Sequence, residues 1–238
     1  YLNTVLGGKA PQHLDFCADD EVQPWLELAN GREVTDNLSF AYGSKMKNLL
    51  LKNENLCNWN ISYQLALLSY DKRAFLKAKQ YCECSLILNN NEYNNHLYSA
   101  ILYQLGDERS VYFAEKCIDI KNSSYCLAES ILSLLLKQQA YDSVINGFNK
   151  LTDDLKQNPR LLMYLSMAYL KFGNAQKAEE ILLSDGGLVL LDFREGDKFL
   201  DRLYRGIRKQ LYNEIYDEIT VPEQFDFIVA DLKTEEEE

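Results

Sequence analysis

Reactive side chains gather most densely in residues 11–21, which read PQHLDFCADDE. Side chains two residues apart point to the same side of an extended chain, so His13, Asp15 and Cys17 could meet at one metal ion. A calcium loop would need a DxDxDG pattern with Glu at its twelfth position, which this stretch lacks. Zinc would need at least one more soft ligand from elsewhere. We therefore predict no metal site, and expect the Leu and Phe of this stretch to be buried as an anchor.

The rest of the chain offers little material for catalysis. It has two histidines, His13 and His96, which limits Cys/His nucleophilic chemistry and histidine metal ligation. No P-loop, GxSxG, HExxH or dinucleotide-binding glycine pattern occurs. The sequence predicts no enzymatic activity and no cofactor for this chain, and leaves open the activity of a larger protein that contains it.

The charge of the chain argues against nucleic-acid binding, because the formal net charge is −11 and a positive footprint is needed. Residues 222–238 contribute −6 of this, and their run TEEEE is typical of a solvated chain end. No apolar run approaches eighteen residues, so we expect no membrane span. The six cysteines are interpreted as reduced, small apolar residues, because a chain of 238 residues can build a core without disulfides.

Internal periodicity predicts the fold. Segments that begin at Trp59, Glu92, Tyr125 and Pro159 are 33, 33 and 34 residues apart and share residue types in three columns. The eighth column holds Ala66, Ser99, Leu132 and Ser166. The fifteenth holds Arg73, Gly106, Gln139 and Gly173, and the twentieth holds Ala78, Val111, Val144 and Ala178.

These columns indicate pairs of antiparallel helices. Small residues let two helices approach closely, and Gly in the turn favours a left-handed helix end. In the second segment the inner face shifts to Ser110, Ala114 and Cys117. The sequence predicts an all-α fold with three parts: an N-terminal arm, four helix pairs, and a capping helix with an acidic tail. Their ranges are 1–58, 59–192 (59–91, 92–124, 125–158, 159–192) and 193–238.

The columns resemble the tetratricopeptide repeat, a helix-turn-helix unit of about 34 residues. The last copy, LLMYLSMAYLKFGNAQKAEEILL, matches best. The resemblance implies a right-handed α-solenoid with a concave groove that binds a peptide or protein. Chaperone-binding members use Lys and Asn where Tyr63 and Leu67 stand here, so a chaperone role is not expected.

Within that groove, the resemblance assigns the exposed positions of each first helix. They form an aromatic and amide lining with basic residues toward one end, which could seat a peptide or stack on a saccharide. The candidate binding residues are Tyr63, Gln64, Tyr70, His96, Tyr103, Gln104, Lys137, Arg160, Tyr164 and Lys171. Packing of these tyrosines between neighbouring repeats is an equally weighted alternative.

Two flanking helices complete the predicted architecture. A helix is expected to begin at Ser44, and another to span 197–217 with Asp197 as its N-cap. The second is amphipathic and would cover the last repeat. Its apolar stripe holds Leu200, Leu203, Tyr204, Ile207 and Leu211, and its basic stripe holds Lys198, Arg202, Arg205 and Lys209. We expect the basic stripe to be solvated; the alternative is that it lies on a membrane surface or meets an acidic partner.

A second resemblance covers nearly the whole chain. The order HLDF…PWL, repeats, REG, amphipathic helix and VPEQFDF is similar to the C-terminal part of certain bacterial proteins. In those proteins an uncharacterised β-supersandwich domain, akin to aldose mutarotases, precedes tetratricopeptide repeats. The resemblance implies a cytoplasmic bacterial protein whose N-terminal domain is missing here. The chain opens on Tyr1, which also suggests a fragment.

Two functions follow from these observations. The first is a non-catalytic interaction module that binds a peptide, a protein or its own missing domain through the tyrosine-rich groove. The alternative is the helical lobe of a carbohydrate-binding or carbohydrate-active protein whose active domain lies upstream.

Overall fold

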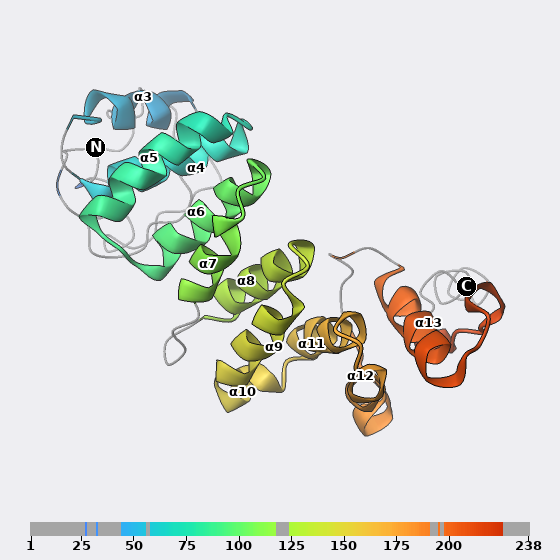
Figure 1. The fold of residues 1–238 in the computed structure, drawn as a ribbon. Coiled ribbons are helices and arrows are strands. Elements are labelled where there is room, and N and C mark those ends of the chain that lie inside the picture. The colour runs from blue at the N-terminus through green and yellow to red at the C-terminus, as the bar shows by residue number, and fades with distance from the viewer. Residues whose placement is uncertain are drawn as a thin grey trace, which may run out of the picture. The chain divides into compact units, whose positions relative to one another are not determined.

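A computed structural model describes residues 27, 32, 44–55, 58–117, 124–190, 195 and 198–225, and every regular element among them is a helix (Figure 1). This confirms the predicted all-α fold class. The ligand-like stretch 11–21, Asp197 and the acidic residues beyond 225 lie outside the described residues. None of the described helices is long and apolar enough to cross a bilayer. The chain divides into two compact units, unit 1 (Tyr1–Cys117) and unit 2 (Ile118–Glu238).

In the described part of unit 1, helix α3 precedes two helix pairs. Helix α3 begins at Ser44, as predicted, and packs on α4. Helix α4 pairs with α5, which packs on α6, and α6 pairs with α7 (Figure 1). The first helices of the two pairs, α4 and α6, also touch. The bounds are α3 Ser44–Lys52, α4 Trp59–Asp71, α5 Phe75–Leu88, α6 Glu92–Gln104 and α7 Arg109–Lys116.

Unit 2 repeats this order of contacts. Helix α8 pairs with α9, α9 and α8 both pack on α11, and α11 pairs with α12. Helix α13 then packs on α12 and α11, in the place of a further first helix. The bounds are α8 Tyr125–Lys137, α9 Tyr141–Lys150, α10 Asp153–Lys156, α11 Pro159–Lys171, α12 Ala175–Leu182 and α13 Phe199–Tyr212, with short 3₁₀ turns η1 Ser184–Gly186, η2 Tyr216–Glu218 and η3 Glu223–Phe225.

The first helix of every pair begins with a side-chain cap. Asn58 Oδ1 accepts hydrogen bonds from the backbone N–H groups of Asn60 and Ile61, which the helix itself cannot satisfy. The equivalent caps are Asn91, Ser124 and Asn158. Because the caps recur with the repeat period, the same signal starts each helix pair.

The turn inside every pair is left-handed at the predicted column. Its φ angles are 56° at Arg73, 70° at Gly106, 59° at Gln139 and 93° at Gly173. Glycine reaches this conformation without the steric cost that a Cβ brings. Arg73 and Gln139 adopt it nevertheless, so the helix pairing imposes the turn even where the residue type disfavours it.

Small polar residues draw the paired helices together. In unit 1 the Ser99 hydroxyl donates to Ser110 O at 2.7 Å, and the Ser110 hydroxyl donates back to Ser99 O at 2.9 Å. In unit 2 the Ser166 hydroxyl donates to Ala178 O at 2.8 Å. All four residues are buried. The one-residue shift predicted for the second pair is confirmed, since Ser110, rather than Val111, faces the first helix.

The capping helix α13 is shorter than predicted. It ends at Tyr212, where Asn213 turns into the left-handed region with φ 56°. Leu200, Leu203 and Ile207 are buried against unit 2, whereas Leu211 lies near the C-terminal end of the helix and is exposed. The predicted apolar stripe thus packs over its first two turns and opens toward solvent at its last.

Candidate functional site

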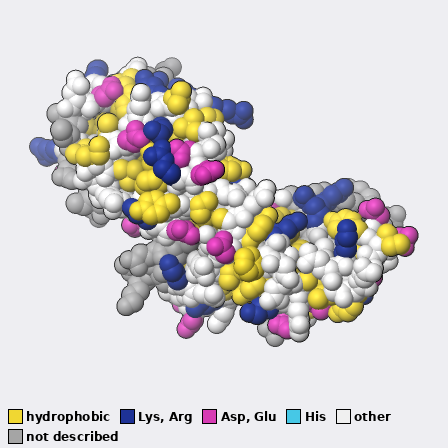
Figure 2. Space-filling model, viewed as in Figure 1, with side chains coloured by type: hydrophobic (Ala, Val, Ile, Leu, Met, Phe, Trp, Pro, Cys, Tyr) yellow, Lys and Arg dark blue, Asp and Glu magenta, His cyan; other side chains and the backbone are white. Residues whose placement is uncertain are grey.

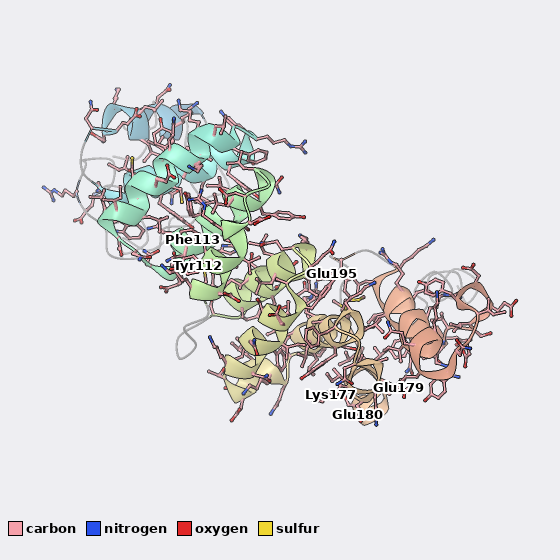
Figure 3. All side chains as sticks on the ribbon, viewed as in Figure 1. Tyr112, Phe113, Lys177, Glu179, Glu180 and Glu195 are labelled. Atoms are coloured by element: carbon pink, nitrogen blue, oxygen red, sulfur yellow. The ribbon has the colours of Figure 1, made fainter. Side chains whose placement is uncertain are left out.

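A buried charged network closes one end of the first helices in unit 2. Arg160, only 5 % exposed, donates from Nη1 to both carboxylate oxygens of Glu195, at 2.8 and 2.9 Å. The Tyr164 hydroxyl donates to the same carboxylate, and Glu129 of α8 lies 3.8 Å from Arg160. Glu195 precedes α13 in the chain and is labelled in Figure 3.

This network makes two predicted binding residues part of the scaffold. Tyr164 is 2 % exposed, and burial together with its bond to Glu195 raises the pKa of its hydroxyl above the ordinary value. A charge buried this deeply needs a partner, and Glu195 supplies it from 35 residues away. Arg160 and Tyr164 are therefore engaged within unit 2 rather than open to a ligand.

The opposite end of α11 carries a pocket of about 400 Å³. Its apolar floor comes from Met167 and Leu170 of α11 and from Phe199 of α13. The remaining lining residues are polar or basic groups and one glycine: Lys171, Arg202, Gly206, Lys209, Gln210 and Tyr216. In the space-filling view, Lys and Arg side chains gather over this part of unit 2 (Figure 2).

Gly206 lies at the contact between α13 and α11. A Cβ at this position would lie 2.7 Å from Leu170 Cδ2, so the end of the Leu170 side chain would have to shift. The absence of a side chain therefore lets α13 approach α11 closely. The approach brings basic residues from two helices to one rim.

The basic residues of α13 divide into two groups. Arg205 donates to Asp201 at 2.8 Å and Arg208 pairs with Glu214, so both are neutralised locally. Lys171, Arg202 and Lys209, which line the pocket, form no ion pair with any carboxylate in the described part of the chain. The pocket therefore combines an apolar floor with an uncompensated positive rim.

Unit 1 has a pocket at the equivalent end of its first helices, with a volume of about 620 Å³. Tyr70 and Phe75 meet edge to face with ring centroids 5.5 Å apart. Gln104 reaches the pocket from α6, and the lining is completed by Leu67, Asp71 and Arg73. This surface is aromatic and polar, with one acid and one base.

The other predicted residues of unit 1 are mostly covered. Gln64 is 1 % exposed. Burial lowers the pKa of His96 to about 4 and raises the pKa of Tyr63 above its ordinary value. Tyr103 is half-buried. These side chains contribute to the inner face of unit 1, and the pockets hold only Tyr70, Gln104 and Lys171 of the predicted set.

Lys137, the remaining predicted binding residue, is exposed at the last turn of α8 and lies outside both pockets. Conversely, several residues that define the sites are not among the predicted binding residues. The sequence predicts Arg202 and Lys209 on a solvated stripe and indicates no role for Glu195. The amphipathic pattern of α13 does predict a helix that packs on the last helix pair. It does not predict which of its basic residues lie next to the exposed end of α11.

Comparisons with known proteins add no assignment. No protein-family model matches the chain, and no curated protein matches its sequence. Among the described residues, no group of three or more His, Cys, Asp or Glu side chains could hold a metal ion.

Proposed function

We infer that this chain is a tetratricopeptide-like interaction module that binds an extended acidic segment of a partner protein. The pocket between α11 and α13 is the proposed binding site. The proposal retains the cytoplasmic location, the bacterial source and the missing upstream domain that the two resemblances imply. It moves the binding residues from the whole groove to the C-terminal ends of the first helices.

The single observation that carries this proposal is the uncompensated positive rim on an apolar floor. Lys171, Arg202 and Lys209 are available to carboxylates, and Met167, Leu170 and Phe199 can bury apolar side chains. An acidic peptide with interspersed apolar residues satisfies both halves of the site. Long-range attraction by the rim would also speed its association.

The test uses a fluorescent octapeptide of alternating Glu and Leu and measures its anisotropy with the chain. We expect binding that weakens with added salt and falls at least tenfold in the double variant Lys171→Ala/Lys209→Ala. The control variant Lys72→Ala/Lys150→Ala removes the same charge from exposed positions outside the pocket. Equal losses in the two variants would show that net charge, rather than the pocket, attracts the peptide.

A second candidate function has its own observation, the aromatic pocket of unit 1. Tyr70 offers a ring face, and Asp71, Arg73 and Gln104 offer hydrogen-bonding groups around it. Sugars stack on aromatic rings and bond to such groups, which is the chemistry of the carbohydrate-related alternative. Titration with glucose and galactose, followed by Tyr fluorescence in the chain and in Tyr70→Ala, tests it. Unchanged fluorescence at millimolar sugar would exclude these two ligands.

A further inference from the structure

We propose that the chain's own acidic run, Glu235–Glu238, occupies the pocket between α11 and α13, so that a partner segment must displace it. This inference rests on the proposed function, because it names an occupant of the same pocket. Three observations support it: the spacing of the cations, the pairing of the other basic residues of α13, and the point at which the described chain ends.

The spacing of the cations fits a run of carboxylates better than a single small anion. Arg202 and Lys209 are seven residues apart on α13, which corresponds to about 10 Å along the helix axis. Four consecutive glutamates of an extended chain span about 10 Å as well. A run of this length can therefore meet both cations at once, and Lys171 of α11 adds a third.

Local pairing distinguishes the cations of this rim from the other basic residues of α13. Arg205 and Arg208 already hold Asp201 and Glu214. Arg160 is buried against Glu195. An approaching carboxylate is therefore repelled by Asp201 and Glu214. It is attracted by Lys171, Arg202 and Lys209, which form no ion pair with an acid in the described chain.

The described chain ends beside α13, so the run Glu235–Glu238 is close enough in sequence to reach the pocket. Phe225 is fully buried, and its ring centroid lies 5.7 Å from that of Tyr204 on α13. Nine residues lie between Phe225 and Glu235, and the ten Cα-to-Cα steps that join them can span up to about 33 Å. Helix α13 itself is only about 21 Å long. The run can thus reach any part of the pocket from its attachment beside Tyr204.

Tethering gives the run an advantage over free peptides. A segment joined by a short linker meets its site at an effective concentration near the millimolar range. A partner segment of similar composition must therefore bind more tightly or present additional apolar contacts to the floor. This arrangement would select partners whose apolar side chains contact Met167, Leu170 and Phe199 and whose carboxylates also pair with the cations of the rim.

Zero-length cross-linking with a carbodiimide tests the contact directly, because it joins a carboxylate to a lysine amine only when the two touch. We expect peptides that link Glu235–Glu238 to Lys171 or Lys209, and none that link the run to Lys72 or Lys150. Mixing ¹⁴N- and ¹⁵N-labelled chains shows whether each link lies within one copy. Links only between copies, or no enrichment at the two pocket lysines, would overturn the proposal.

Competition separates this inference from the proposed function. Replacing all four glutamates of the run by glutamine should raise the affinity for the Glu/Leu octapeptide at least tenfold, and Lys171→Ala/Lys209→Ala should abolish that gain. Equal octapeptide affinities with and without the four substitutions would refute occupancy by the run and leave the proposed function standing. Cross-links at the pocket without octapeptide binding to the glutamine variant would refute the proposed function instead.

Discussion

The two units use one framework to present different chemistry at equivalent positions. At the second and sixth positions of a first helix, unit 1 buries Asn60 and Gln64, while unit 2 buries Arg160 and Tyr164. At the thirteenth position, the four pairs in order carry Asp71, Gln104, Lys137 and Lys171. This position lies at the C-terminal end of each first helix, and Asp71, Gln104 and Lys171 line the pockets whereas Lys137 does not.

This difference separates residues that build a pair from residues that give it a function. Caps, turns and small inner residues recur with the period, because every pair needs them. The thirteenth position changes from acid to amide to lysine because exposed helix ends tolerate any polar residue. The binding chemistry of such a module therefore resides in the positions that the repeat leaves free.

The largest expected effect lies in the buried network of unit 2. Glu195→Ala should destabilise the unit by about 3 kcal/mol, because it removes the carboxylate that accepts two hydrogen bonds from the buried Arg160 guanidinium. Urea unfolding followed by circular dichroism reports the loss. Both tryptophans of the chain fall in unit 1, so the fluorescence transition should stay unchanged.

The matched control is Glu214→Ala, which removes a carboxylate from the partly exposed pair with Arg208. Exposed pairs contribute little, so this change should cost less than about 1 kcal/mol. If Glu195→Ala cost no more than Glu214→Ala, the network would not anchor the segment before α13. A shift in the fluorescence transition would show instead that the two units unfold together.

The second expected effect is a pH dependence of the stability of unit 1. Burial holds the folded pKa of His96 near 4, against an ordinary value of 6.5. The unfolded state therefore binds more protons between these values, so stability is complete above about pH 6.5 and falls as the pH drops toward 4. One pKa unit corresponds to about 1.4 kcal/mol, and since the imidazole keeps some exposure we expect a loss of about 2 kcal/mol.

Tryptophan fluorescence during urea unfolding measures this loss, because it reports unit 1 alone. His96→Gln should flatten the stability profile between pH 6.5 and 4. Unit 2 contains no histidine, so its dichroism transition should change less over the same range. A wild-type profile that matched the variant would mean that His96 titrates normally in the folded state.

The sequence predicts the helix pairs and their turns, but it predicts the residues of the two pockets only in part. The columns at Gly106 and Gly173 identified the turns because local sterics alone decide which residues adopt a left-handed φ. Arg160 was read as a groove residue because an arginine is seldom buried, and its partner Glu195 is too distant in sequence to signal the contact. The rim is absent from the sequence prediction because it forms where α13 packs on α11, and such a contact between distant helices depends on tertiary packing.

The smallest expected effect compares the two glycine turns. A Cβ at Gly106 or Gly173 meets nothing within 4 Å, so alanine there costs only backbone strain. The φ of 70° at Gly106 lies near the left-handed minimum, whereas the 93° at Gly173 lies well beyond it. Gly106→Ala should cost about 1 kcal/mol and Gly173→Ala more, seen by fluorescence and dichroism respectively.

Gln139→Gly is the reverse test, because Gln139 already holds a φ of 59° near the minimum. Glycine would relieve the backbone strain at this position, but it would also increase the conformational freedom of the unfolded chain. The two effects oppose each other, so the free energy of unfolding should change by no more than about 0.5 kcal/mol. A large gain at Gln139 would mean that pairing holds the turn under strain at every copy. A small change there, with clear losses at both glycines, would mean that the turn conformation varies between copies and that residue type follows it.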